Sequence, residues 1–417
     1  MLGGPRSQLK LLGRAPEFRL LFLATFASSL GTWVAVVALT VDVYDRTGSA
    51  KWVSALLIAD FLPAVAIGLL LGPLVDRLSR RRLLIAADLA RFGVFVALPF
   101  ATSPGQIVAL AAAAGFATGF FRPAVMAGLP NLVSEADLPA ANSLLRSIEY
   151  VAWTAGTLLG GLITSISGPD PAYWLNAATF LVSALLIAGI SASMLQSEKA
   201  VSRGHWLDLK EGFDLVFGSR PLLAVFISWN LVMLSNAGIN VAEVFLARVC
   251  FGAGNFGFGL LWAGSGVGLI LGSPYAATWL EHRSLSFVYG GALGLMAFGA
   301  LTAALSPSVW VAAFCMALGG SGNGAAIVCN SLLVQRGAPD HLRGRAFTTI
   351  MSVNFALLGI GMAVAGPITD AVGARWVFGG AAVLAAAGGL VGRSMTRGIR
   401  PTPAPDESDA QAASAVG

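Results

Sequence analysis

Long apolar runs recur along the whole chain, and they restrict the folds open to it more than any other feature. A helix of ~20 apolar residues is long enough to cross a hydrocarbon layer about 30 Å thick. Of the 417 residues, 56% are hydrophobic and only 11% are charged, and the mean hydropathy is +0.77. This composition excludes the soluble globular class and predicts an all-α integral membrane protein.

Twelve such runs are separated by short polar or basic segments, and each run predicts one transmembrane helix. The predicted helices cover residues 18–41, 53–71, 83–100, 106–127, 142–166, 172–194, 222–249, 257–280, 285–305, 309–334, 346–368 and 376–391. The first six form an N-terminal bundle within residues 1–195, and the last six form a C-terminal bundle within 221–400. A cytoplasmic linker at 196–220 joins them, and residues 401–417 form a disordered cytoplasmic tail, because they are rich in Pro, Ala and acidic residues.

The two halves of the chain repeat weakly. Asp-Val-Tyr at Asp42 to Tyr44, near the end of the first predicted helix, matches Glu-Val-Phe at Glu243 to Phe245, near the end of the seventh. Gly72 has its counterpart in Gly272. A parallel repeat of six spans predicts two pseudo-symmetric six-helix bundles around a site near the middle of the membrane.

Basic residues gather in alternate loops, and this sets the predicted orientation. With both termini in the cytoplasm, inside segments hold 20 of the 26 Lys and Arg residues, outside segments hold four, and Arg91 and Arg122 lie within spans. Cytoplasmic loops carry such an excess, so both termini are predicted to be cytoplasmic. The formal charge of +5 follows this topology and therefore predicts no nucleic-acid partner.

The sequence offers no pattern for a metal site, a nucleotide site or a catalytic triad. The three cysteines fall in or beside apolar runs without metal-ligand spacing, and the three histidines are scattered over predicted loops. The phosphate-binding pattern Gly-x-x-x-x-Gly-Lys-Ser/Thr is absent. The chain is predicted to need no cofactor and not to be an enzyme.

A strongly charged turn, Gly-Pro-Leu-Val-Asp-Arg-Leu-Ser-Arg-Arg-Arg at residues 72–82, lies between the second and third apolar runs. Asp76 stands at the end of its helix, where a carboxylate opposes the helix dipole and needs an outside partner. The turn resembles the Gly-x-x-x-Asp-Arg-x-x-Arg-Arg-Arg signature of major facilitator superfamily (MFS) transporters. The resemblance implies that Asp76 latches onto the start of the eleventh helix. The latch residues are then Gly72, Asp76, Arg77, Arg80, Arg81, Arg343 and Arg345. The alternative is that the arginines only fix the topology.

Further segments resemble the export branch of this family, which includes macrolide efflux proteins and the enterobactin exporter. They are Gly31-Thr32-Trp33, Phe121-Arg122-Pro123-Ala124 and Leu129-Pro130-Asn131-Leu132-Val133. This resemblance implies a monomeric, proton-coupled exporter of a small, fairly hydrophobic molecule, such as a drug, a macrolide-like compound or a siderophore, in a bacterial inner membrane. Antiporters of the family often carry Gly-Pro-x-x-Gly-Gly in the fifth helix, whereas residues 156–161 here read Gly-Thr-Leu-Leu-Gly-Gly. An importer, or a sensor or assembly protein on the same scaffold, therefore remains an alternative.

Ionisable groups inside membrane spans are costly, which makes them functional candidates. The candidates for proton coupling are Asp42, Asp60, Glu149, Glu243 and Arg122. Arg122 and Glu149 lie on consecutive helices and could form a buried ion pair, unless Glu149 pairs with nearby Arg146. Asp42 and Glu243, related by the repeat, could meet at an outer gate and share a proton, or each could lie at the water interface. Asp60 could carry protons or bond a neighbouring helix.

Polar and aromatic residues on the helices predicted to line the cavity are the candidates for contacting a substrate. They are Thr32, Trp33, Asn236, Asn240, Asn323 and Asn330. Helical Asn also bonds neighbouring helices, so each position has a structural alternative. The expected partners are a small-molecule substrate, protons and the lipid bilayer.

The latch leads to a testable prediction. Replacing Asp76 by Asn removes the charge that holds the two halves together, so turnover should fall severely while the protein still reaches the membrane. Initial transport rates, normalised to the amount of protein in the membrane, measure this. Near-normal transport would contradict the latch.

Overall fold

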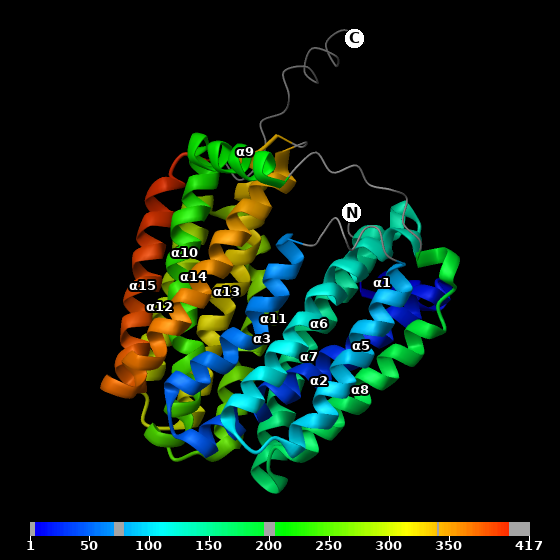
Figure 1. Ribbon diagram of the computed structural model, residues 1–417. Helices are drawn as coiled ribbons and strands as arrows, with labels where there is room; N and C mark the ends of the chain where they lie inside the picture. The colour runs from blue at the N-terminus through cyan, green and yellow to red at the C-terminus, as the bar shows by residue number, and fades with distance from the viewer. Residues whose placement is uncertain (1–4, 71–78, 196–204, 340–341, 400–417) are drawn as a thin grey trace, which may run out of the picture.

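The computed structural model describes residues 5–70, 79–195, 205–339 and 342–399, and in these ranges all regular elements are helical. Figure 1 shows the long helices gathered into two bundles that lie side by side. The helices of the first bundle are α2 (Pro16–Thr47), α3 (Ala50–Leu70), α5 (Arg80–Ala97), α6 (Pro104–Gly128), α7 (Leu138–Ser167) and α8 (Asp170–Ala188). Those of the second bundle are α10 (Arg220–Phe245), α11 (Gly254–His282), α12 (Leu285–Leu305), α13 (Val309–Gly337), α14 (Arg343–Val372) and α15 (Ala374–Met395).

Short helices complete the described chain. Helix α1 (Pro5–Arg14) packs on α2 and α7, and α9 (His205–Gly218), from the predicted linker, packs on α14 and α10. A π-helical turn, η5 (Leu246–Cys250), extends α10, and the sequence patterns did not indicate it. The 3-10 turns are η1 (Leu98–Phe100), η2 (Leu129–Asn131), η3 (Glu135–Asp137) and η4 (Ala192–Leu195).

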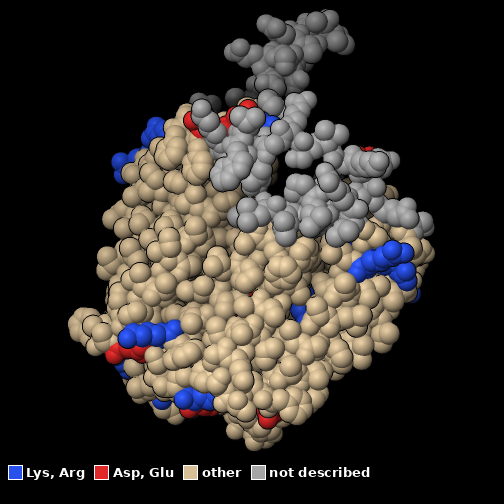
Figure 2. All heavy atoms as spheres, in the orientation of Figure 1, with Lys and Arg blue, Asp and Glu red and all other residues tan. Residues whose placement is uncertain are grey.

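Eleven helices of the described chain are long and apolar enough to cross a membrane. The predicted fifth span, residues 142–166, coincides with the 30-residue α7, which lies outside that group. Polar and small residues along α7 lower its mean hydropathy. The other eleven predicted spans are confirmed by length and composition. On the face seen in Figure 2, charged side chains gather toward the two ends of the bundles, and uncharged residues form most of the surface between them.

Local signals explain where several helices begin and turn. Ser103 and Gln106 form a reciprocal capping box at the start of α6, and Ser308 accepts a hydrogen bond from the backbone N–H of Val311 at the start of α13. Gly48 ends α2 with φ of +60°, a left-handed conformation that suits glycine. The chain can therefore enter α3 two residues later.

Glycines let two helices of the second bundle approach closely. A Cβ atom on Gly268 of α11 would lie 1.9 Å from the carbonyl oxygen of Ala317 in α13, and one on Gly272 would lie 2.0 Å from that of Ser321. In lipid, helices associate through such backbone contacts, because the lipid tails are as apolar as the side chains. The glycines thus fix the α11–α13 spacing.

Both bundles run between two faces of the molecule. We call the face at which α2 begins and α15 ends the terminal side, and the opposite face the far side (Figure 1). Between the bundles, α7 packs on α11, and α3 packs on α14. A Cβ on Gly259 of α11 would lie 2.4 Å from the carbonyl oxygen of Thr157 in α7, so these two backbones almost touch.

The α11–α13 contact can be tested by adding one methyl group. Gly268→Ala should force α11 and α13 apart, and overpacking of this kind costs about 1–3 kcal/mol. The midpoint of thermal unfolding in detergent should therefore fall. Gly291→Ala on α12 is the matched control, because its Cβ would meet nothing within 4 Å. Equal midpoints for the two variants would show that the close approach does not limit stability.

Candidate functional site

Two neighbouring cavities lie within and between the bundles, and we call them the first and the second lobe. The first lobe, of about 320 Å³, belongs to the first bundle, and the second lobe, of about 300 Å³, is lined mainly by the second bundle. Trp33 of α2 and Trp153 of α7 line both lobes. The two lobes are therefore neighbouring compartments with a shared aromatic wall.

Three tryptophans meet at this wall, and we call them the tryptophan cluster: Trp33, Trp153 and Trp262. The rings of Trp33 and Trp153 are stacked with centroids 5.4 Å apart, and Trp262 of α11 lies 5.7 Å from Trp33 and 6.2 Å from Trp153. The indole N–H groups of Trp153 and Trp262 are buried and have no hydrogen-bond partner among the described residues. The cluster joins the two bundles and leaves two donors available.

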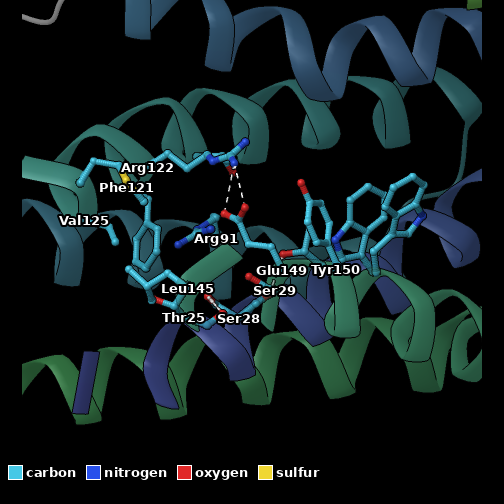
Figure 3. Close-up of a pocket in the computed structure, with 15 residues that line it drawn as sticks. Thr25, Ser28, Ser29, Arg91, Phe121, Arg122, Val125, Leu145, Glu149 and Tyr150 are labelled. Carbon is cyan, nitrogen blue, oxygen red and sulfur yellow. Dashed lines mark hydrogen bonds and ion pairs between the residues drawn. The ribbon is translucent and has the colours of Figure 1, made fainter. Parts of the chain in front are cut away.

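The first lobe contains an ion pair between α6 and α7, drawn in Figure 3. One guanidinium nitrogen of Arg122 lies 3.1 Å and 3.2 Å from the two carboxylate oxygens of Glu149. Of the two partners that the sequence left open for Glu149, Arg122 and Arg146, the structure pairs it with Arg122. The expectation that the pair is buried is wrong, because 70% of the Arg122 side chain and 30% of the Glu149 side chain are exposed. Both side chains border the open lobe instead of packing between helices.

A second ion pair, between Arg91 and Asp88, is buried. Arg91 also lines the first lobe. Arg91 bonds Asp88 one turn earlier on α5, and Asp88 also accepts a 2.7 Å hydrogen bond from Ser183 of α8. The guanidinium lies 4.3 Å from the ring centres of Phe121 and Phe180. Cation–π contact and the carboxylate together compensate the buried charge. This pair ties α5 to α6 and α8.

The second lobe holds a carboxylate without a partner. Glu243 of α10 is 3% exposed, and its Oε1 atom has no hydrogen-bond partner among the described residues. Four of the six predicted substrate residues line this lobe with it: Trp33, Asn236, Asn240 and Asn323. Three methionines, from α10, α12 and α13, complete the apolar wall: Met233, Met296 and Met316.

On the far side, the structure pairs residues differently from the predicted gate. Asp42 lies 2.6 Å from Arg46 and accepts a 2.9 Å hydrogen bond from the Tyr173 hydroxyl, both within the first bundle. It is therefore satisfied locally, whereas Glu243 lines the second lobe. An ion pair that crosses between the bundles joins Asp45 to Arg248 of η5.

Asp370 forms a further link across the far side. This residue near the end of α14 accepts hydrogen bonds from the backbone N–H groups of Ala50 (2.7 Å) and Lys51 (3.3 Å) and from the hydroxyl of Ser49 (2.9 Å). A carboxylate at a helix N-terminus satisfies unpaired amides and favours the helix dipole. One bundle thus supplies the N-terminal cap of α3 in the other.

The remaining candidates are spread over the spans. Thr32 lines the first lobe, although its hydroxyl donates a 2.7 Å hydrogen bond to the Ser28 carbonyl. Asn330 lies on α13 outside both lobes, with a buried Oδ1 that has no partner in the described chain. Asp60 lies in α3, also outside both lobes, where its backbone carbonyl is close to Gly115 of α6.

The predicted latch is described only in part, because Gly72, Asp76 and Arg77 lie outside the described residues. Within the described part, Arg81 donates to the carbonyl of Ala188 and Arg80 begins α5. Arg343 donates a 2.8 Å hydrogen bond to the carbonyl of Gln335, and Arg345 pairs with Glu211 of α9. These arginines anchor the terminal side, and the Asp76 latch stays a prediction.

Two members of the tryptophan cluster, Trp153 and Trp262, were not among the residues predicted from sequence. A signal for Trp153 exists, because tryptophans of membrane helices gather at the two interfaces, whereas Trp153 lies at the middle of α7. Asp45, Arg248 and Asp370 were missed because their charges lie at helix ends, where charged side chains are common.

Comparison with known proteins agrees with this architecture. Among curated proteins, the multidrug efflux pump Tap of Mycobacterium tuberculosis is 27% identical over 392 residues, which cover 88% of this chain and 90% of Tap. The putative bacilysin exporter BacE of Bacillus amyloliquefaciens is 26% identical over 310 residues, covering 73% of this chain and 76% of BacE.

Solved structures share the fold at low sequence identity. The nucleoside transporter NupG superimposes with a TM-score of 0.73 at 14% identity, covering 91% of this chain and 99% of NupG. A bacterial homologue of the iron transporter ferroportin, in an inward-facing state, gives 0.70 at 16% identity, covering 92% and 99%. The family model of the Major Facilitator Superfamily matches residues 21–361 and 226–415. The chain is therefore a multi-pass membrane transporter that belongs to the Major Facilitator Superfamily.

Proposed function

We propose that this transporter exports a small, fairly hydrophobic molecule from a bacterial cell in exchange for protons. The observation that carries the proposal is the second lobe, where Trp, Met and Asn side chains line a cavity together with the unpaired, buried carboxylate of Glu243. The efflux function in the names of Tap and BacE supports the outward direction. Drugs, macrolide-like compounds and siderophores are the molecules to test.

The placement of contacts between the bundles supports a mechanism of alternating access. The far side is closed by the Asp45–Arg248 pair and by the bonds of Asp370 to the start of α3. Arg122 and Glu149, in the halves of α6 and α7 toward the terminal side, are exposed to the first lobe. We assign the terminal side to the cytoplasm, where the Lys and Arg excess places it. The arrangement is then an inward-facing state of a monomer in the inner membrane.

Proton coupling needs a carboxylate whose protonation changes as the bundles move. Glu243 is our principal candidate, because no basic side chain among the described residues lining the lobe compensates its charge when it is ionised. The Arg122–Glu149 pair is a second candidate, since it joins α6 to α7 at the open lobe. Asp42 and Asp60 rank lower, because Asp42 is already bound by Arg46 and Tyr173 and Asp60 lies outside both lobes.

Import in symport with protons is the second candidate function. Residues 156–161 lack the proline of the antiporter pattern, and Gly156 and Gly160 instead pack closely against α2. Their Cβ atoms would lie within 2.7 Å of Trp33 and of the Val34 carbonyl oxygen, respectively, so these glycines have a packing role. A transport-direction measurement separates the two functions.

The direct test uses purified protein in liposomes that contain a pH-sensitive dye. Macrolides, dyes and siderophores are added one at a time, with protein-free liposomes as the control. Proton movement opposite to a compound supports export by antiport. Movement in the same direction supports the importer, and no movement with any compound leaves a sensor or assembly role on this scaffold.

Replacing Glu243 by Gln keeps the shape of the side chain and removes its ability to exchange a proton. We expect the pH dependence of transport to disappear and proton-driven flux to fall at least tenfold. Glu281→Gln is the control, because Glu281 is an exposed carboxylate near the end of α11. An unchanged pH profile in the Glu243 variant would remove this residue from the proton path.

Replacing Asp370 by Asn should favour the outward-open state. Hydrogen bonds to a charged group contribute about 1.5–3 kcal/mol, so the open population should rise roughly tenfold or more. Spin labels at Ser167 and Pro307, which are exposed far-side positions in different bundles, report the change as a longer distance. Asp170→Asn, an exposed far-side carboxylate, should leave the distance distribution unchanged. Identical distributions for both variants would show that Asp370 does not hold the gate.

A further inference from the structure

We infer that the second lobe selects molecules that carry a positive charge on an aromatic framework, with Glu243 as the counter-ion and the tryptophan cluster as the aromatic wall. The inference deepens the proposed function, on which it rests for the idea that this lobe holds the transported molecule. It concerns the class of substrate, which neither the fold nor the names of the relatives specify.

The charge of the lobe points to a cation. Of the described residues that line it, Glu243 alone is ionisable, and the others are aromatic, aliphatic, thioether, hydroxyl, amide or glycine residues. Its Oε1 has no hydrogen-bond partner, and 3% of the residue is exposed. A buried carboxylate is compensated either by a proton or by a cation close to it. A cationic ligand and a proton would thus compete for one group, which links binding to proton exchange.

The wall of the lobe points to an aromatic framework. Trp33, Trp153 and Trp262 present large π-systems at one end, and cations and aromatic rings both bind favourably over such faces. The methionines Met233, Met296 and Met316 supply flexible, polarisable side chains that adapt to different shapes. Anionic ligands find no such support, because none of the described residues that line the lobe is basic.

The first lobe differs from the second in the pairing of its charged side chains. Its two basic side chains already have carboxylate partners, since Arg122 bonds Glu149 and Arg91 bonds Asp88. The first lobe therefore has no unpaired charge among these four residues, whereas the second lobe has one. We therefore assign the discrimination between substrates of different charge to the second lobe.

Tetraphenylphosphonium and tetraphenylborate test this directly, because they share one shape and carry opposite charges. Equilibrium dialysis against the purified full chain in detergent, corrected for detergent partitioning, gives the dissociation constants without any proton gradient. We expect the cation to bind at least tenfold more tightly than the anion. Glu243→Gln should lower the affinity for the cation at least tenfold, Glu243→Asp should restore part of it, and Glu281→Gln should change nothing.

Trp262→Leu is a second variant that leaves the carboxylate in place, and it should also weaken binding of the cation. The inference is overturned if the anion binds as tightly as the cation, if neither binds, or if Glu243→Gln binds the cation like the wild type. Binding that requires Glu243 without proton exchange in liposomes would refute the proposed function alone. Proton exchange with neutral or anionic compounds, without binding of the cation, would refute this inference alone.

Discussion

A charge inside an apolar helix bundle needs a partner, and this constraint explains most of the polar architecture of the chain. Asp88 is bound by Arg91 and Ser183, and Asp42 by Arg46 and Tyr173. These side chains are rigid parts of the scaffold, because breaking either set would leave a buried charge uncompensated. Glu243 departs from this pattern, because its Oε1 atom has no hydrogen-bond partner among the described residues. A carboxylate without a partner is available to bind another ligand.

The α-helical membrane fold could be predicted from sequence because the bilayer acts on each segment separately. A run such as residues 285–305 shows its length and hydropathy locally, and α12 spans the same residues. The charged turn at 72–82 carried the resemblance to the family, which the family match then confirmed. Helix ends were less accurate: α2 continues to Thr47, because Arg46 bonds Asp42 four residues earlier and so stays helical.

The site could be predicted only where sequence neighbours also meet in space. Arg122 and Glu149 lie on consecutive helices, and their pairing was one of two alternatives that the sequence left open. Their exposure was not predicted, because no local pattern shows which side chains border a cavity. Trp262 reaches Trp33 only through the packing of α11 against the first bundle, and Asp370 reaches Ala50 across more than three hundred residues of sequence. No local pattern encodes such contacts, since they depend on the relative placement of two bundles.

The cap that Asp370 gives to α3 makes the end of one helix depend on the position of another bundle. In this state the amides of Ala50 and Lys51 are bonded to a carboxylate that moves with α14. In the outward-open state that we propose, the first turn of α3 exchanges that carboxylate for water. The protection of these two amide protons against solvent deuterium is therefore a built-in reporter of which face of the transporter is open.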